Sequence, residues 1–504
     1  MLASLSGGQP QRAERFVSSP PSPADTGEAQ GAPSRVGLAL ATALVGVIAL
    51  HLLEPELSIT WSYAHLSREG WRVGAALLLS VTLPFLGAWA WTSRASKRPL
   101  QRLAGARLAA LGTCAIGGLA ALGAIAPAPP SNYDSTVLLD TVRGARDGPV
   151  RWMLSTASLQ ALVGPFIQQA DPTRWVAAAN SAFAGVGLLG LIAAAREIAQ
   201  TRGEAFALSA IVLSAFGTAQ IAIGYLEVYP LALALVGSYI GFAARSLQRG
   251  DGLATCAAIV AIGPFFYIGL ALLAPSAIVL GLLHLRREGG GRRVVRATVI
   301  GVLVAAAATV PHYGVPFAWA AFAAEVTADN HALLGLQAGS PLLPLSYLWS
   351  TQHLKEVLHS LLLVDPVGWL LLLFPGLALL RREGPGGLPP IGLFLASIAV
   401  PYALYAFAMD PLYGVYLDWD LWVTGAPAIS LLGGWAFLTW GRDQPRVTGA
   451  LLGLALACAG VHALARLHAI PVEAERHLQE SPFHISSQME IPRASRRATS
   501  ARDA

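Results

Sequence analysis

The sequence predicts an all-α, polytopic membrane protein with about 13 transmembrane helices, and three features of the chain support this fold class. First, 54% of the 504 residues are hydrophobic and only 12% are charged, about half of the roughly 25% that soluble domains carry. Second, apolar runs recur that are long enough to cross a ~30 Å hydrocarbon core, which takes about 20 helical residues. Third, short arginine-rich connections alternate with connections of a different character.

The apolar runs give the elements in chain order. We expect spans at 36–53, 73–92, 108–126, 175–195, 205–223, 230–244, 253–268, 270–285, 295–311, 362–380, 388–408, 424–440 and 447–465. Residues 1–34 are rich in Ser, Pro, Gly and Ala without apolar periodicity, which is typical of a disordered tail. The expected organisation is therefore a cytoplasmic tail at 1–34, a multi-pass domain at 35–465 and an outer C-terminal tail at 466–504.

The arginine-rich connections predict the sides of the membrane. They are 93–107, 195–204, 245–251, 284–293, 381–387 and 441–446, which are alternate connections in this topology. Because Lys and Arg concentrate in cytoplasmic loops, these connections and the N-terminus are expected in the cytoplasm. The same rule accounts for the net charge of +5 without a nucleic-acid partner, since no basic-aromatic module is visible. The three cysteines fall inside apolar runs and are expected to be small packing residues.

The first outer connection contains "SNYDSTVLLDTVRGARDGPVRWMLS" (131–155), directly after a predicted span. Asp134 and Asp140 are six residues apart, so a helix would not place them on one face. Arg143 and Arg151 follow, and arginine is suited to bidentate phosphate recognition. The alternative is an amphipathic interfacial helix whose charges are solvated.

Two later outer connections also carry ionisable groups. "GYLEVYP" (224–230) places Glu227 between Tyr225 and Tyr229, where it either joins Asp134's connection in an outer polar pocket or only caps the neighbouring backbone. "YLWSTQHLKEVLH" (347–359) contains His353 and Lys355, which could hold a phosphate or could be interfacial side chains. The i, i+4 histidine pair of an HExxH zinc site is absent from this segment.

The last outer connection contains "VYLDWDLW" (415–422). In an extended segment Asp418 and Asp420 point the same way, and two close carboxylates could chelate a divalent cation. Trp419 and Trp422 could stack on a sugar ring or could belong to an interfacial belt. Since ionisable groups near the hydrocarbon edge suggest a polar site, the four outer motifs together predict one site.

On these residues the chain resembles the GT-C superfamily of polytopic glycosyltransferases, which includes the protein O-mannosyltransferases and the aminoarabinose transferases, and within it an uncharacterised bacterial branch. "NYDS" (132–135) matches the position of the family's first acidic motif, and the later outer acids follow in the family's order. The first motif has a single aspartate where some members have a tight acidic pair, so a need for Mg²⁺ or Mn²⁺ stays open.

The resemblance implies transfer of a sugar from a polyprenyl-phosphate donor to an acceptor hydroxyl at the outer face of a bacterial inner (plasma) membrane. The acceptor, a lipid, a glycan or a protein, is not identified. Asp134 would be the catalytic base. The implied substrate-binding residues are Tyr225, Glu227, Tyr229, Tyr416, Asp418, Trp419 and Asp420, and the implied phosphate-binding residues are Arg143, Arg151, His353 and Lys355.

A secondary transporter of a polar or lipid-linked substrate is the alternative function. It would place acids in mid-span and show internal repeats with broken helices. The acids here are expected at span ends on one side, and no convincing repeat is visible, although "AIGPFFYIGLALLAP" (261–275) could be a broken helix. A membrane scaffold without catalytic activity is the remaining class.

Overall fold

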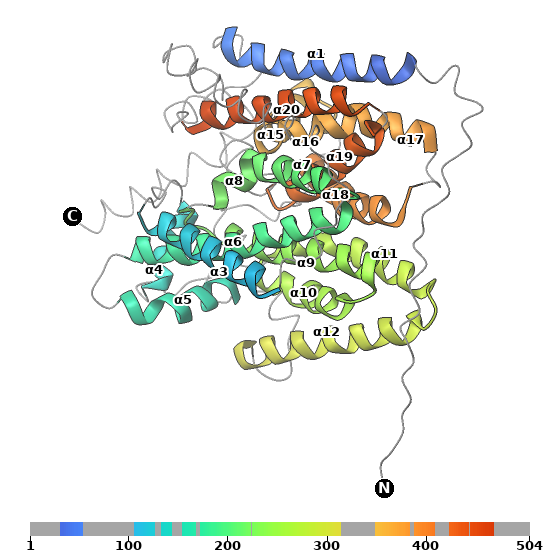
Figure 1. The fold of residues 1–504 in the computed structure, drawn as a ribbon. Coiled ribbons are helices and arrows are strands. Elements are labelled where there is room, and N and C mark those ends of the chain that lie inside the picture. The colour runs from blue at the N-terminus through green and yellow to red at the C-terminus, as the bar shows by residue number, and fades with distance from the viewer. Residues whose placement is uncertain are drawn as a thin grey trace, which may run out of the picture.

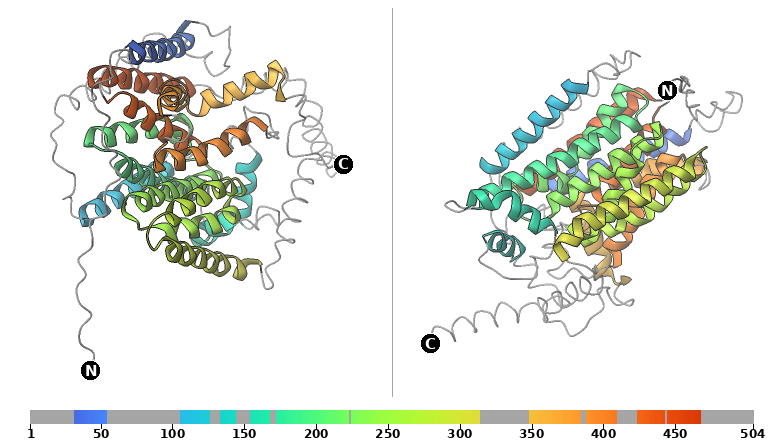
Figure 2. Two further views of the ribbon diagram at one scale, coloured as in Figure 1. Left: turned by 90° about the vertical axis from the view of Figure 1, so that its right-hand side faces the viewer. Right: turned by 90° about the horizontal axis from the view of Figure 1, so that it is seen from below.

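The structure is a computed structural model that describes residues 31–53, 105–125, 133–143, 154–167, 172–222, 224–313, 348–383, 388–408, 423–442 and 444–467. These residues form helices, turns and short connections, with no β-strand in the described ranges. The longer helices lie roughly side by side in one bundle, with α1 at the top of Figure 1 and α12 at the bottom, and two further views show the same stack (Figure 2).

The helices follow each other along the chain in this order: α1 (Gly31–Leu53), α3 (Gly105–Ile125), α4 (Tyr133–Val142), α5 (Leu154–Ile167), α6 (Pro172–Ile198), α7 (Arg202–Ser214), α8 (Phe216–Ala222), α9 (Tyr229–Arg249), α10 (Leu253–Phe266), η5 (Ile268–Leu273), α11 (Ala274–Leu285), α12 (Gly290–Tyr313), α15 (Thr351–Val364), α16 (Pro366–Leu371), η6 (Leu372–Gly376), α17 (Leu377–Glu383), α18 (Pro390–Ala408), α19 (Ala426–Trp440) and α20 (Pro445–Leu467).

The predicted fold class of a polytopic helical membrane protein is confirmed. Each expected span coincides with one or more of these helices, except 73–92, which lies outside the described residues. Five stretches are long and apolar enough to cross a membrane, namely Pro172–Ile198, Tyr229–Arg249, Ile268–Leu285, Gly290–Val310 and Pro390–Ala408. The expected N-terminal tail at 1–34 overlaps the start of α1, which begins at Gly31, and the expected C-terminal tail at 466–504 overlaps the end of α20, at Leu467. The remaining residues of both tails lie outside the described ranges.

One expected span is interrupted. The segment 205–223 divides into α7 and α8 at Ala215, whose backbone is extended (φ −60°, ψ 115°). The two spans expected at 253–268 and 270–285 are separated close to their expected boundary, at Tyr267, which is also extended (φ −158°, ψ 121°) and lies between α10 and a 3₁₀ turn that leads into α11. A 13-residue helix such as α7 is only about 20 Å long, so it cannot cross a ~30 Å core by itself.

The centre of the bundle is the pair α6 and α9, which approach each other through glycines. A Cβ added at Gly241 would lie 2.6 Å from the carbonyl oxygen of Gly190, and one added at Gly237 would meet the carbonyl of Gly187. Small residues at such positions let two backbones come into van der Waals contact, which is a main source of helix association in membranes. Glycine is therefore required at this crossing.

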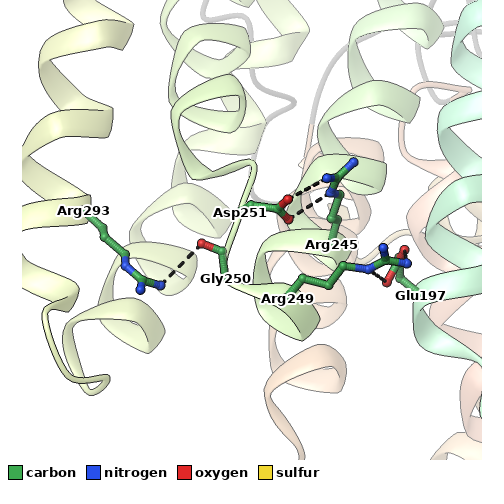
Figure 3. Close-up of polar contacts among 6 residues, drawn as sticks. All are labelled: Glu197, Arg245, Arg249, Gly250, Asp251 and Arg293. Carbon is green, nitrogen blue, oxygen red and sulfur yellow. Dashed lines mark hydrogen bonds and ion pairs between the residues drawn. The ribbon is translucent and has the colours of Figure 1, made fainter. Parts of the chain in front are cut away.

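The arginine-rich connections that the structure describes meet at one end of the bundle. Arg249 at the end of α9 forms an ion pair with Glu197 at the end of α6, as Figure 3 shows. Arg442, after α19, forms an ion pair with Glu204 in α7. Arg293 of α12 reaches the connection after α9 by donating to the carbonyl of Gly250 (Figure 3). The prediction that these connections share one side is consistent with all these contacts, and we call this the arginine end.

The connections assigned to the opposite side contain short helices that are not among the expected spans, one of them within 131–155, for which an interfacial helix is the alternative. Helices α4 and α5 lie in the connection 127–174, and α15 lies largely in 312–361. In Figure 1, α4 and α5 lie at the left, whereas the turn between α11 and α12 lies at the right. Among the cysteines, Cys256 and Cys458 are buried as expected, but Cys114 is exposed on α3, so the prediction that it is a packing residue is wrong.

Candidate functional site

The connection between α8 and α9, residues 224–228, is recessed within the bundle. The side-chain amide Nδ2 of Asn180 in α6 donates to the carbonyls of Tyr225 and Glu227, both at 2.8 Å. The backbone N–H of Gly224, which has a φ of 71°, donates to Oγ of Ser181 at 2.8 Å. These bonds satisfy backbone groups that no helix serves, which a membrane interior requires. We call residues 224–228 the recessed connection.

The recessed connection meets α6 inside the length of that helix. Asn180 is eight residues beyond the first residue of α6, or about 12 Å along the helix axis. The expectation that "GYLEVYP" joins two helices agrees with its place between α8 and α9. Its level relative to the outer membrane face stays a prediction.

Glu227 is 4% exposed. A carboxylate in such a place is expensive unless it is partnered, and in a membrane protein it marks a functional site by default. Its backbone carbonyl is held by Asn180, so the amide fixes the backbone from which the carboxylate projects. Burial of Glu227 is compatible with both interpretations, a place in a polar pocket and a cap on neighbouring backbone.

Aromatic side chains surround the recessed connection. Tyr225 and Tyr229 are both buried, and their ring centroids are 6.5 Å apart. Tyr229 packs edge-to-face on Tyr267, at 5.3 Å, at the break between α10 and η5. The hydroxyl of Tyr402 in α18 donates to the carbonyl of Gly269, at 3.2 Å, just beyond that break. The break at Tyr267 thus adjoins a tyrosine-rich region.

The first and second outer motifs share a hydrophobic cluster. Leu226 of the recessed connection is 2% exposed and packs in a cluster with Leu138 and Leu139 of α4. Asp134 lies in α4 one turn before Leu138, so the two positions lie on one face of that helix. The helix that carries Asp134 and the connection that carries Glu227 therefore contribute to one hydrophobic cluster.

The arginine of α4 is on the surface of the protein. Arg143 donates to Oδ1 of Asp140 at 3.3 Å, and both side chains are at least one-third exposed. An exposed pair of this kind contributes little to stability. Arg151 lies outside the described residues.

His353 joins α15 to α18. It is 2% exposed, and its Nε2 lies 2.7 Å from the backbone carbonyl of Phe407. A carbonyl only accepts, so Nε2 carries the proton. The ring of Phe407 also packs edge-to-face on the His353 ring, at 5.3 Å. Lys355, two residues on, is exposed, so Lys355 and not His353 offers a solvent-accessible cation.

The residues Tyr416, Asp418, Trp419 and Asp420 lie outside the described ranges, but the chain that follows them is anchored. Val423 and Thr424 are fully buried. Gly217 of α8 lies against Val423, because a Cβ added there would be 2.9 Å from Val423 Cγ2. The aspartate-containing segment therefore leads directly onto α8, the helix that enters the recessed connection.

Sequence reasoning missed four residues of this region: Asn180, Ser181, Tyr267 and Asp365. Asp365, fully buried between α15 and α16, accepts from the N–H of Gly368 at 2.8 Å and from the hydroxyl of Ser430. The available signal for Asn180 and Asp365 was the presence of a strongly polar side chain within or beside an apolar run. Within the described ranges, no group of three or more His, Cys, Asp or Glu side chains could hold a metal ion.

The comparisons with known proteins give similarity at the level of structure alone. No protein-family model matches the chain, and no curated protein matches it. The fold is similar to the crystal structure of ArnT from Cupriavidus metallidurans in the apo state, with a TM-score of 0.45 and 14% identity over 72% of this chain and 77% of that chain. It is also similar to the crystal structure of the same ArnT bound to undecaprenyl phosphate, with a TM-score of 0.42 and 14% identity over 72% and 79% of the respective chains.

Proposed function

We propose that the protein is a membrane glycosyltransferase that moves a sugar from a polyprenyl-phosphate donor to an acceptor hydroxyl, at the membrane face opposite the arginine end. The observation that supports this proposal is the hydrophobic cluster to which both α4, which contains Asp134, and the recessed connection, which contains the buried Glu227, contribute leucines. Two segments that are remote in sequence and that each carry an acid thereby share one cluster, with buried tyrosines in the recessed connection, a composition that suits a site for a sugar beside a lipid phosphate.

In the proposed reaction the carboxylate of Asp134 removes the proton of the acceptor hydroxyl. The acceptor oxygen then forms a bond to the anomeric carbon while the bond from that carbon to the phosphate oxygen breaks. The electron pair of the broken bond leaves with the polyprenyl phosphate, whose charge needs cationic partners. Lys355, Arg151 and Arg143 are the proposed partners.

The remaining residues are assigned to substrate positioning. Glu227 would accept hydrogen bonds from sugar hydroxyls, with Tyr225 and Tyr229 beside it. Asp418 and Asp420 would complete the sugar site, with Trp419 and Tyr416 as stacking faces. His353 would hold the start of α15 through Phe407, so that its part in phosphate binding is to position Lys355. Mg²⁺ or Mn²⁺ at Asp418 and Asp420 is the candidate cofactor.

The test is glycosyl transfer from a polyprenyl-phosphate sugar by the purified full-length protein. Asp134→Asn keeps the size of the side chain and removes the base, so turnover should fall by about 10²–10⁴-fold. Asp140→Asn is the matched control in the same helix, and it should retain most activity because Asp140 faces solvent beside Arg143. Full activity in Asp134→Asn together with loss in Asp418→Asn would assign the base to 415–422.

A transporter is the second candidate, because the helix break at Tyr267 packs against Tyr229, two residues after the buried Glu227, and a second helix breaks at Ala215. Broken helices that line a buried site are typical of secondary transporters. Reconstituted vesicles separate the two functions. Uptake of a polar solute that Glu227→Gln abolishes, with no sugar transfer in any preparation, would favour transport over the glycosyltransferase.

A further inference from the structure

The connection from α11 to α12 carries the densest basic segment of the arginine end. Between positions 286 and 296 the sequence "RREGGGRRVVR" contains five arginines and a single acid, Glu288. Such clusters directly beside a membrane span are attracted to anionic lipid headgroups. The structure shows which of these arginines are already engaged within the protein.

Two of the five arginines hold the protein together. Arg287 donates to the carbonyls of Ser246 and Leu247, at 3.3 and 2.6 Å, and thereby satisfies the last turn of α9. Arg293 donates to the carbonyl of Gly250 (Figure 3). Both residues therefore fix the α11–α12 turn against the end of α9.

The other three arginines differ from those elsewhere at this end. Arg245, Arg249 and Arg442 form ion pairs with Asp251, Glu197 and Glu204 respectively. In the part of the chain that the structure describes, Arg286, Arg292 and Arg296 are exposed and make no ion pair with an acid. Their positive charge is therefore available to a ligand.

Arg292 and Arg296 continue into an apolar stripe on α12. Positions 292, 296, 299 and 303 are spaced by four, three and four residues, so they lie along one face of the helix. Val299 is 52% exposed and Leu303 is 62% exposed. The helix places two charges at the membrane edge and an apolar track directly below them, which is the order of a phospholipid headgroup and its acyl chain.

The packing of α12 turns this stripe away from the bundle. On the opposite face Ala297 is 3% exposed, and a Cβ added at Gly301 would lie 2.9 Å from the carbonyl oxygen of Ala257 in α10. Figure 1 shows α12 at the edge of the bundle, with α10 on its inner side. The stripe therefore faces the lipid.

We propose that Arg292 and Arg296, with Val299 and Leu303, form a binding site for an anionic phospholipid in the leaflet at the arginine end. The two guanidiniums hold the phosphate of the headgroup, and an acyl chain lies along the apolar stripe. Arg286, directly after the end of α11, adds a third positive charge to the site. The exposed residues Ile278, Leu282 and Leu285 lie along one face of α11 before it. The site is independent of the proposed catalytic region at the other end of the bundle.

The experiment measures lipid binding to the purified full-length protein in a nonionic detergent by native mass spectrometry. Phosphatidylglycerol and phosphatidylcholine with identical acyl chains are titrated separately, and phosphatidylglycerol should bind more tightly. The affinity of Arg292→Gln/Arg296→Gln for phosphatidylglycerol should be about 25-fold lower than that of the parent protein, because each arginine contributes a factor of about five. Phosphatidylcholine binding should be unchanged in this variant.

The matched control is Arg196→Gln/Arg202→Gln, which also removes two exposed charges from the arginine end but on α6 and α7. Phosphatidylglycerol affinity should stay within about twofold of that of the parent protein, because the charges lie away from α12. An equal loss in both double variants would overturn the site in favour of a diffuse attraction. Equal affinity of the parent protein for the two lipids would also overturn it.

Two further measurements distinguish the source of the phosphate and keep the test valid if the glutamine variant does not fold. Inorganic phosphate or glycerophosphoglycerol that displaces the lipid at the lipid's own concentration would show a free-anion site and overturn the proposal. Arg292→Lys/Arg296→Lys keeps the charge and should keep the preference for phosphatidylglycerol. Loss of that preference in the lysine variant would show that charge does not determine binding.

Discussion

Replacing Asn180 by leucine should release the recessed connection, because this side chain alone holds two of its carbonyls. Leucine has the same number and branching of side-chain heavy atoms as asparagine and is compatible with the apolar surroundings of α6, so the change removes hydrogen bonds without opening a cavity. Asn180 is fully buried, and both of its bonds, to Tyr225 and Glu227, are 2.8 Å long. The expected effect is local opening of residues 224–228 and not loss of the fold.

The magnitude follows from the two bonds. A hydrogen bond contributes a net of about 1 kcal/mol in proteins and about 0.6 kcal/mol on average within a membrane protein. Two bonds therefore amount to about 1–2 kcal/mol, which raises the open fraction of the connection about 5- to 30-fold. Asn180→Asp should open it further, since a carboxylate in place of the amide faces two carbonyl oxygens and is repelled by both.

Thiol labelling of Leu226→Cys measures this opening, in a background from which the three native cysteines have been removed. Leu226 is 2% exposed, so the thiol should be protected in the parent protein and labelled about 5- to 30-fold faster with Asn180→Leu. The matched control is Ser209→Ala in α7, whose hydroxyl bonds only within its own helix. Equal labelling rates with and without Asn180→Leu would refute the role of this amide.

Three further outcomes test the packing and the charges. Gly237→Val should lower stability by about 1–3 kcal/mol because its side chain meets the backbone of α6, whereas Gly281→Ala, which has open space around it, should be neutral in thermal unfolding. Asp365→Ala should destabilise the protein by about 0.5–2 kcal/mol, the usual range for a lost N-cap, and Asp365→Asn by less because it keeps an acceptor for the helix N–H and the hydroxyl on α19. The hydrogen bond from Arg245 lowers the pKa of Asp251. The ion pair therefore contributes below about 1 kcal/mol to the free energy of unfolding, because the pair is exposed. This contribution is full above about pH 4 and is lost as the pH falls through the lowered pKa. The free energies of unfolding of Asp251→Asn and of the parent protein should therefore converge in acid.

The positions of the spans could be predicted because they depend on composition over about 20 residues, a property of the sequence alone. The shared end of the arginine-rich connections could be predicted for the same reason, and the ion pair between Arg249 and Glu197 is consistent with it. Helices α4, α5 and α15 could not be predicted from the criterion for a span, because each is too short or too polar to meet it. Their presence depends on packing against the bundle, as Leu138 and Leu226 show.

The break at Ala215 and the burial of Glu227 could not be predicted. The sequence around Ala215, "IVLSAFGTAQIA" (211–222), has neither a proline nor a charge to mark an interruption. The break is stabilised by distant partners: Asn180 and Ser181 receive the chain after α8, and Gly217 leaves room for Val423. A local pattern does not contain contacts between residues more than 40 positions apart.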